Sequence, residues 1–181
     1  MTTAQIIDAC VLINLLATEE LETILGAAKK PALICSIVES ESIYLRTGDP
    51  HNPKEPIDLK AFIIDGALSV CQIESAKEEL LYVDFASALD DGEAMTLAIA
   101  IARNFDLATD ERKARRLFLE EIADPKRLIS TSGLIRHWAE VKKIPSKKLT
   151  ETVIKIERRA SYRPPPDDRN HRWWINALRR G

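Results

Sequence analysis

The chain has 181 residues, of which 45% are hydrophobic and 30% are charged. This composition is typical of a folded protein and excludes global disorder, and the length suits one domain with a tail. Every apolar run is shorter than the ~18 residues of a membrane span, and no basic segment precedes the first run. We therefore expect neither a membrane protein nor a signal peptide. The cysteines Cys10, Cys35 and Cys71 lie in apolar runs outside any CxxC motif, which predicts reduced core residues of a cytoplasmic protein.

The net charge of −2 hides a difference between the two parts of the chain. Residues 1–135 carry 13 Lys+Arg and 23 Asp+Glu, a balance of −10, whereas residues 136–181 carry 13 Lys+Arg and 5 Asp+Glu, a balance of +8. An acidic body with a basic end suits a site that holds cations beside a surface that attracts polyanions. Alternatively, the two parts pair with each other or with a partner chain.

The first third of the chain alternates apolar runs with helical patterns. Residues 5–13 read as a buried parallel strand interrupted only by Asp8, and residues 14–30 read as a helix that Pro31 ends. A short strand over 32–34 and a helix over 36–46 follow. Residues 47–56 contain three prolines and a glycine and are predicted to be a loop, whereas residues 59–64 fit a helix or a strand.

The same alternation continues to about residue 131. The predicted elements in this part are a strand over 67–73, a helix over 75–89, a break at 90–93, a helix to Asn104, a strand over 105–109, a helix over 111–121 and a strand over 127–131. Strands that alternate with helices predict an α/β sandwich with a mostly parallel central sheet flanked by helices. We expect domain boundaries at 1–131 for this α/β unit and 132–181 for a basic helical extension packed on the same domain.

The extension is predicted to contain helices over 134–143 and 146–159 and then an irregular tail with Trp173 and Trp174. Two functions are open for the tail. In the first, Trp138, Trp173 and Trp174 are packing anchors, which we favour. In the second, Trp173 or Trp174 stacks on bases while nearby arginines contact phosphates, namely Arg158, Arg159, Arg163, Arg169 and Arg172.

Acidic residues fall at the strand ends where α/β proteins bind their ligands. Asp8 lies in or at the end of the first strand, where an ionised carboxylate is costly to bury unless it is paired or metal-bound. Asp110 directly follows the strand over 105–109. Each of them has a structural alternative, because either aspartate could cap the following helix, as could Thr109.

Two further acidic groups lie at or near helix starts. Asp91 and Glu93 begin the clearest helix of the chain, although Asp90 and Glu93 also fit a capping box. Glu39 and Glu41 are two positions apart in the helix over 36–46, so they point to different faces. Several carboxylates without a nearby histidine or cysteine favour a hard cation such as Mg²⁺ or Mn²⁺. Such a metal can activate water for attack on a phosphodiester.

Four segments in the same order resemble the PIN-domain ribonucleases, including the VapC-like toxins of toxin–antitoxin pairs. They are IIDACVLINLLA at 6–17, ESIYLR at 41–46, LDDGEAMTLAIAIA at 89–102 and LATDERKARR at 107–116. The resemblance covers about residues 5–131 and implies a PIN-like three-layer sandwich. No GxxxxGK[ST], GxGxxG or GxSxG motif occurs, which argues against a P-loop nucleotidase, a Rossmann dehydrogenase and an α/β-hydrolase.

The resemblance implies which acids are catalytic and hold the metal. Carried over position by position, the four acids are Asp8, Glu41, Glu93 and Asp110. Glu41 is preferred over Glu39 because the family spacing runs without a gap from Pro31 to Glu41. Asp91 shares or replaces the metal-binding role of Glu93. Three more residues occupy matching places around the acids and are expected to act on the metal ligands without binding the ion directly: Asn14, Thr109 and Glu111. Glu111 either holds the metal through a water molecule or has no role.

The resemblance implies a metal-dependent endoribonuclease with Mg²⁺ or Mn²⁺ as cofactor and RNA as substrate. For the toxin group it further implies a small antitoxin protein and a homodimer. The alternative is a catalytically silent PIN-like module that binds RNA or protein. A structure-specific DNA nuclease is a third class, but the chain is short for it and lacks an obvious helical clamp.

Overall fold

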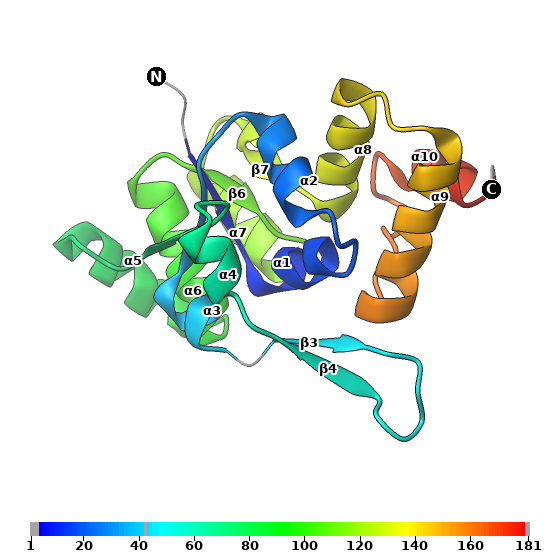
Figure 1. Ribbon diagram of the computed structural model, residues 1–181. Helices are drawn as coiled ribbons and strands as arrows, with labels where there is room; N and C mark the ends of the chain where they lie inside the picture. Colours follow the sequence, from blue (N-terminus) through cyan, green and yellow to red (C-terminus); the bar gives the residue numbers. More distant parts are fainter. Residues whose placement is uncertain (1–3, 42, 180–181) are drawn as a thin grey trace. The chain divides into compact units, whose positions relative to one another are not determined.

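The computed structural model describes residues 4–41 and 43–179, which form two compact units (Figure 1). The first unit is built from Met1–Leu12, Lys30–Glu41 and Leu59–Ser130, and the second from Ile13–Lys29, Ser42–Asp58 and Thr131–Gly181. The sequence-based division at residue 131 stays a prediction. The outer ends of its two domains, residues 1–3 and 180–181, lie outside the described residues.

A five-stranded parallel sheet forms the centre of the first unit. Its strands, in spatial order, are β5 (Ser69–Cys71), β2 (Ala32–Cys35), β1 (Gln5–Ile7), β6 (Asp106–Ala108) and β7 (Leu128–Ile129). Every neighbouring pair is parallel. The central strand β1 is fully buried, as expected for an apolar run with neighbours on both sides. The predicted mostly parallel α/β fold is therefore confirmed.

Helices flank this sheet. Those of the first unit are α3 (Ser36–Ser40), α4 (Lys60–Ile64), α5 (Ala76–Ala86), α6 (Asp91–Ala102), α7 (Arg112–Glu121) and the 3₁₀ turn η1 (Pro125–Arg127). Helix α6 packs on β1, β2 and β6 and contacts α3, α5 and α7. Ala94, Leu97 and Ala98 are fully buried on α6, as their helical spacing predicts. Asp90 caps this helix, because its side chain accepts a hydrogen bond from the amide of Glu93 at 2.8 Å.

An ion pair connects the start of α5 to the end of α6. Ser75 and Glu78 form a capping box, and Nε of Arg103 donates to Oε1 of Glu78 at 2.7 Å. The guanidinium of Arg103 lowers the pKa of Glu78 to about 2. Because Glu78 is buried, this ion pair holds the two helices together through a charge that has little access to water.

The predicted strand over 5–13 is wrong beyond Ile7. Helix α1 (Ala9–Leu16) begins directly after Asp8, whose carbonyl accepts the amide of Leu12 at 2.9 Å. The apolar run continues past Ile7 because α1 also has a high proportion of apolar residues. A short apolar run fits a buried helix as well as a strand, so the pattern did not show where the strand ends. The boundary between the two units falls within α1, after Leu12.

The predicted helix over 14–30 is two helices. Between α1 and α2 (Leu21–Ala28), Glu19 adopts a left-handed conformation with φ 63°. The Thr18 hydroxyl donates to the carbonyl of Leu15 and accepts the amide of Glu20. A side chain that bonds to neighbouring backbone groups replaces the helical hydrogen bonds and ends the first helix.

The predicted helix over 36–46 and loop over 47–56 are also partly wrong. Helix α3 ends at Ser40, and β3 (Ile43–Arg46) pairs antiparallel with β4 (Lys54–Ile57) to form a hairpin (Figure 1). Burial alternates along β3, as in a half-buried strand. Residue 42, between the two elements, lies outside the described residues. The ambiguous segment over 59–64 contains the helix α4.

The second unit contains this hairpin and the helical C-terminal extension. Besides α2, its helices are α8 (Thr131–Val141), α9 (Ser146–Lys155), the π-helical turn η2 (Ile156–Ala160) and α10 (His171–Arg179). Helix α2 packs on α8, and α10 packs on α9. Among the described residues, no helix is long and apolar enough to cross a membrane.

The irregular tail predicted over residues 163–174 is wrong from His171 onwards, where α10 begins. Trp174 is fully buried, donates Nε1 to Oε1 of Glu157 at 3.0 Å, and meets the edge of the Tyr162 ring at 5.7 Å between centroids. Trp138 is also buried, with 1% of its surface exposed. The interpretation of these two tryptophans as packing anchors is therefore confirmed, whereas Trp173 is half-buried.

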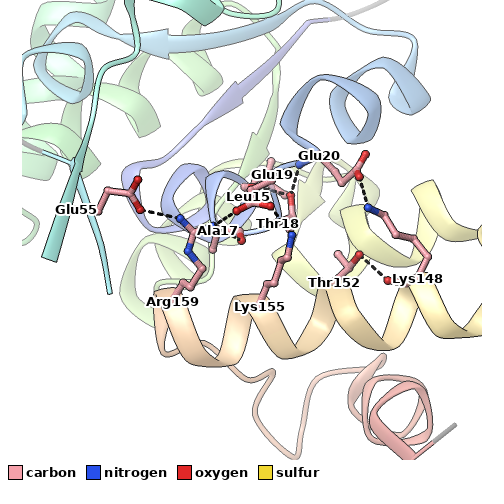
Figure 2. A network of polar contacts seen from close by, with 10 residues as sticks. All are labelled: Leu15, Ala17, Thr18, Glu19, Glu20, Glu55, Lys148, Thr152, Lys155 and Arg159. Carbon is pink, nitrogen blue, oxygen red and sulfur yellow. Dashed lines mark hydrogen bonds and ion pairs between the residues drawn. The ribbon is translucent and has the colours of Figure 1, made fainter. Parts of the chain in front are cut away.

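A network of ion pairs binds the cationic side of α9 and η2 within the second unit (Figure 2). Lys155 and Arg159 both pair with Glu19, the Arg159 contact being 2.7 Å, and Lys148 pairs with Glu20. Arg159 also reaches Glu55 of β4 at 2.9 Å. Part of the basic charge of the C-terminal segment is therefore neutralised by acidic residues of the same unit.

Candidate functional site

The strand order places the first and the fourth predicted acids beside each other. The order of strands reverses between β1 and β6, which makes this the switch point where open α/β sheets bind ligands. Ile7 pairs with Ala108 at the ends of these strands, so Asp8 and Thr109 emerge side by side. The Thr109 hydroxyl donates to Oδ2 of Asp8 at 2.7 Å. Asp110 follows directly.

Asp8 is held by three donors in a buried position, with 3% of its surface exposed. Besides Thr109, the amide of Ala9 donates to Oδ1 at 2.8 Å and the Cys10 thiol donates to Oδ2 at 3.1 Å. Burial raises the pKa of Asp8 above its ordinary value, while these hydrogen bonds act in the opposite direction. Asp8 therefore lies at the start of α1, which is the position that its alternative role as a helix cap requires. It also lies at the edge of the sheet where ligands bind.

Cys10 belongs to this site and not to the apolar core. Its half-buried sulfur also lies 3.7 Å from the Thr109 hydroxyl and accepts the amide of Asp110 at 3.5 Å. Burial and then the charge of Asp8 raise the pKa of the Cys10 thiol, so the thiol stays protonated and acts as a donor. The prediction of a core position was wrong for Cys10, whereas Cys35 and Cys71 are buried as expected. Its place two residues after Asp8 is the signal that could have identified it.

Glu41 and Asp90 meet at the first turn of α6. A methyl group added at Gly92 would lie 2.7 Å from Oε1 of Glu41 and 3.6 Å from Oδ1 of Asp90. The absence of a side chain at Gly92 therefore leaves space for the Glu41 carboxyl group. Burial, followed by the charges of Asp90 and Asp8, raises the pKa of Glu41.

Glu93 is coupled to the same group of acids. Burial raises its pKa to about 7, and the charges of Asp90, Asp8 and Glu111 add to the shift. Carboxylates that raise one another's pKa lie close together and lack compensating positive charge. We call Asp8, Glu41, Asp90 and Glu93 the carboxylate cluster. The sequence identified Asp90 only as a helix cap, so its place in the cluster was missed.

The other candidates differ in their surroundings. Asp91 is exposed and accepts a hydrogen bond from the Tyr82 hydroxyl at 3.1 Å. Asp110 and Thr109 do not cap α7, whose N-cap residue is Glu111, so that capping alternative was wrong. The amide of Asp110 donates to the Cys10 sulfur at 3.5 Å, which places Asp110 near the cluster.

Three residues named in the sequence analysis remain: Glu111, Glu39 and Asn14. Glu111 donates its amide to the Thr109 hydroxyl at 3.2 Å, so Thr109 connects it to Asp8. Glu39 is exposed on α3. Asn14 belongs to the second unit, where its side chain donates to the Thr131 hydroxyl at 3.0 Å. The roles assigned to these residues stay predictions.

The cluster has the donor chemistry of a site for a hard cation, but its side chains do not form a complete coordination shell. Carboxylate oxygens are the donors that Mg²⁺ and Mn²⁺ prefer. Burial first, and then the charges of neighbouring carboxylates, raise the pKa values of Asp8, Glu41 and Glu93, so a bound cation would favour their ionised forms. Within residues 4–41 and 43–179, however, no group of three or more His, Cys, Asp or Glu side chains is arranged to hold a metal ion. The donor types fit a divalent metal, and its binding would require the side chains to move together.

A family model described as a PIN domain matches residues 4–122. The chain belongs to the PIN-domain family. No curated protein and no solved structure matches it. The match includes the complete carboxylate cluster and four of the five strands of the parallel sheet. PIN domains are usually nucleases and generally use divalent metals, so this PIN domain has a nuclease-type, hydrolytic function.

Proposed function

We propose that this PIN-domain protein is a metal-dependent endoribonuclease that hydrolyses RNA phosphodiester bonds. The observation that carries the proposal is the position of Asp8, a member of the carboxylate cluster, at the carboxyl end of β1 beside Thr109 at the end of β6, where the strand order reverses. Three of its members have a raised pKa, and a bound cation would favour their ionised forms.

Asp8, Glu41, Glu93 and Asp110 would hold Mg²⁺ or Mn²⁺, with Asp90 or Asp91 supplying further negative charge. When bound, such an ion supplies activated water and stabilises the charge that develops on a phosphodiester. The protein's own contribution is to orient the ligands. Thr109 and Cys10 both donate to Oδ2 of Asp8, and Ala9 donates to Oδ1, so this carboxylate has a defined direction before any ion binds.

The experiment is cleavage of a mixed RNA pool with Mg²⁺, with Mn²⁺ and with EDTA. We expect cleavage only with metal and a loss of more than about 100-fold in Asp8→Asn and in Glu41→Gln, because a direct ligand contributes more than its supporting groups. Glu39→Gln is the matched control for Glu41→Gln and should keep wild-type activity, because Glu39 lies two positions earlier on α3, whereas the carboxyl group of Glu41 lies against Gly92 at the first turn of α6.

Asp8→Asn separates the catalytic role from the capping role. Asparagine caps helices as well as aspartate, so the variant should melt near the wild-type temperature while losing cleavage. An Asp8→Asn protein with full activity would contradict the metal-binding role of Asp8. Equal cleavage in EDTA and in Mg²⁺ would contradict metal dependence.

One alternative function is a catalytically silent PIN-like module that binds RNA or protein. The observation that favours it is that, among the described residues, the acidic side chains are not arranged to hold a metal ion. A melting experiment with and without millimolar Mn²⁺ distinguishes the two functions. A ligand that binds only the folded state raises the melting temperature by mass action, so the nuclease should be stabilised by Mn²⁺ and the silent module should not.

A narrower proposal is that the protein is the toxin of a toxin–antitoxin pair, a homodimer restrained by a small antitoxin. Its support is the resemblance of four sequence segments to VapC-like toxins. Induced expression should then stop bacterial growth, and expression of Asp8→Asn at the same level should not. Growth arrest by both proteins would exclude nuclease activity as its cause.

A further inference from the structure

The β3–β4 hairpin has two chemically different faces. In an antiparallel pair, directly opposed residues share a face, and the register pairs Tyr44 with Pro56 and Arg46 with Lys54. All four of these side chains are exposed, and we call them the outer face. The inner face carries Ile43 and Leu45, which are 3% and 1% exposed, and β3 packs on η2.

The outer face combines an exposed aromatic ring with two cations. Tyr44 has 46% of its surface exposed, and Nζ of Lys54 lies 5.9 Å from the centroid of its ring. Arg46 is the direct neighbour of Lys54 across the two strands. In the part of the chain that the structure describes, neither Arg46 nor Lys54 forms an ion pair.

The acidic charge of the two strands lies on the inner face of the hairpin. Glu55, between Lys54 and Pro56, pairs with Arg159 at 2.9 Å (Figure 2). No acidic residue of β3 or β4 therefore lies on the outer face. The two strands present uncompensated positive charge beside an aromatic ring, which is the composition of surfaces that bind single-stranded nucleic acid.

We propose that the outer face of the hairpin binds single-stranded RNA. Tyr44 stacks on a base, while Arg46 and Lys54 contact the phosphates on either side of it. The proposal rests on the ribonuclease function above, which supplies the class of nucleic acid, and adds a substrate-binding surface to it.

The structure favours this surface over part of the basic C-terminal segment. Two of the arginines considered there are engaged within the second unit: Arg159 with Glu19 and Glu55, and Arg163 with Glu157 at 2.6 Å. An arginine already paired to a carboxylate has to break that contact before it binds a phosphate. Among residues 4–41 and 43–179, no carboxylate forms an ion pair with Arg46 or Lys54.

The test is the affinity of the full-length protein for a fluorescein-labelled single-stranded RNA in EDTA, measured by anisotropy across a salt series. EDTA prevents metal-dependent cleavage, so binding is measured alone. We expect Tyr44→Ala to weaken binding by about 5- to 100-fold, the range for loss of one base–aromatic stack, and Tyr44→Phe to bind like the wild type. Arg46→Gln with Lys54→Gln should reduce the slope of log affinity against log salt by about 1.4, or ~0.7 for each phosphate contact.

Two exposed residues on α5 provide matched controls. Leu80→Ala removes an apolar side chain that is 69% exposed, and Lys77→Gln removes an exposed cation; both should bind RNA like the wild type. Melting temperatures identify any variant that is unfolded. The Arg46→Gln/Lys54→Gln protein decides the question if Tyr44→Ala is destabilised, because it keeps the ring.

Different results would overturn RNA binding by the hairpin and the ribonuclease function. If the wild type cleaves RNA and both hairpin variants bind RNA with unchanged affinity and salt slope, the outer face is not an RNA-binding surface, and a protein partner becomes its expected occupant. If the wild type neither binds nor cleaves RNA, the ribonuclease proposal itself is overturned.

Discussion

The Thr109 hydroxyl donates a hydrogen bond to Oδ2 of Asp8 at 2.7 Å, although the two residues are 101 positions apart in the chain. The contact exists because β1 and β6 are parallel neighbours whose ends are in register. The same hydroxyl accepts the amide of Glu111 at 3.2 Å. One small side chain thus links the carboxylate after β1 to the segment after β6.

Loss of the Thr109 hydroxyl should weaken metal binding and RNA cleavage. Thr109→Val preserves the shape of the side chain but removes the donor to Asp8, and we expect a 10- to 100-fold loss in metal affinity and in activity, as for other groups that orient metal ligands. Thr109→Ser keeps the donor and is the control. Titration calorimetry with Mn²⁺ and RNA cleavage rates measure both effects; a Thr109→Val protein as active as Thr109→Ser would show that orientation of Asp8 is unimportant.

Gly92→Ala tests the role of Glu41 without changing any charge. The new methyl group would lie 2.7 Å from Oε1 of Glu41, so the carboxyl group has to move away from the first turn of α6. Because alanine is favoured over glycine in a helix by ~1 kcal/mol, the melting temperature should stay the same or rise. RNA cleavage should fall. Full activity in Gly92→Ala would indicate that the observed position of Glu41 is not the active one.

The stability of the metal-free protein should decrease between pH 5 and pH 7.5. The pKa of Glu93 is about 7 in the folded protein and 4.5 in the unfolded chain, so in this window the folded state holds a proton that the unfolded state has lost. Raising the pH then favours unfolding, and the raised pKa values of Asp8 and Glu41 act in the same direction. Urea unfolding in EDTA at several pH values measures this dependence.

Glu93→Gln is the matched variant for this pH dependence. It removes the titrating group and should make the free energy of unfolding less dependent on pH above 5. The ion pair of Glu78 with Arg103 does not interfere, because the lowered pKa of Glu78, about 2, affects stability only below pH ~4.5. A wild-type protein that becomes more stable from pH 5 to 7.5 without metal would contradict the described cluster.

Trp174→Ala should strongly destabilise the second unit. The side chain is fully buried and donates to Oε1 of Glu157, so its removal leaves a large cavity and takes away one of the two donors to that oxygen, the other being Arg163. We expect a loss of about 3–5 kcal/mol in the free energy of unfolding. Trp173→Ala, at the half-buried neighbouring position, should cost clearly less. Equal effects of the two substitutions on chemical denaturation would argue against an anchoring role specific to Trp174.

The sequence was sufficient for the parallel α/β fold and for most of the acids near the switch point. Strands that are buried on both sides have continuous apolar runs, and α6 has apolar residues at helical spacing. Both kinds of element can therefore be recognised from short stretches of sequence. Asp8 and Asp110 were identifiable because each follows such a run. The PIN-domain resemblance, carried by the same short segments, was confirmed over residues 4–122.

Local patterns could not decide where the apolar run around Asp8 changes from strand to helix, because a buried helix and a buried strand are equally apolar over a few residues. The hairpin was missed for a related reason: β3 and β4 stabilise each other only by pairing across a loop rich in turn-forming residues. Helix α10 packs on α9, and its Trp174 is buried and bonded to Glu157 of η2, so this helix depends on contacts with segments earlier in the chain.

Only the tertiary structure brought Cys10 and Asp90 into the site. The Cys10 thiol donates to Asp8 two residues away, and its sulfur accepts the amide of Asp110 because β1 and β6 are aligned. A helix-capping aspartate becomes one of the cluster because α3 ends beside α6. Hydrogen bonding and Coulomb coupling act over a few ångströms in space, whatever the separation along the chain. Local sequence patterns therefore identify which side chains are available for chemistry, and the packing of strands and helices decides which of them act on one another.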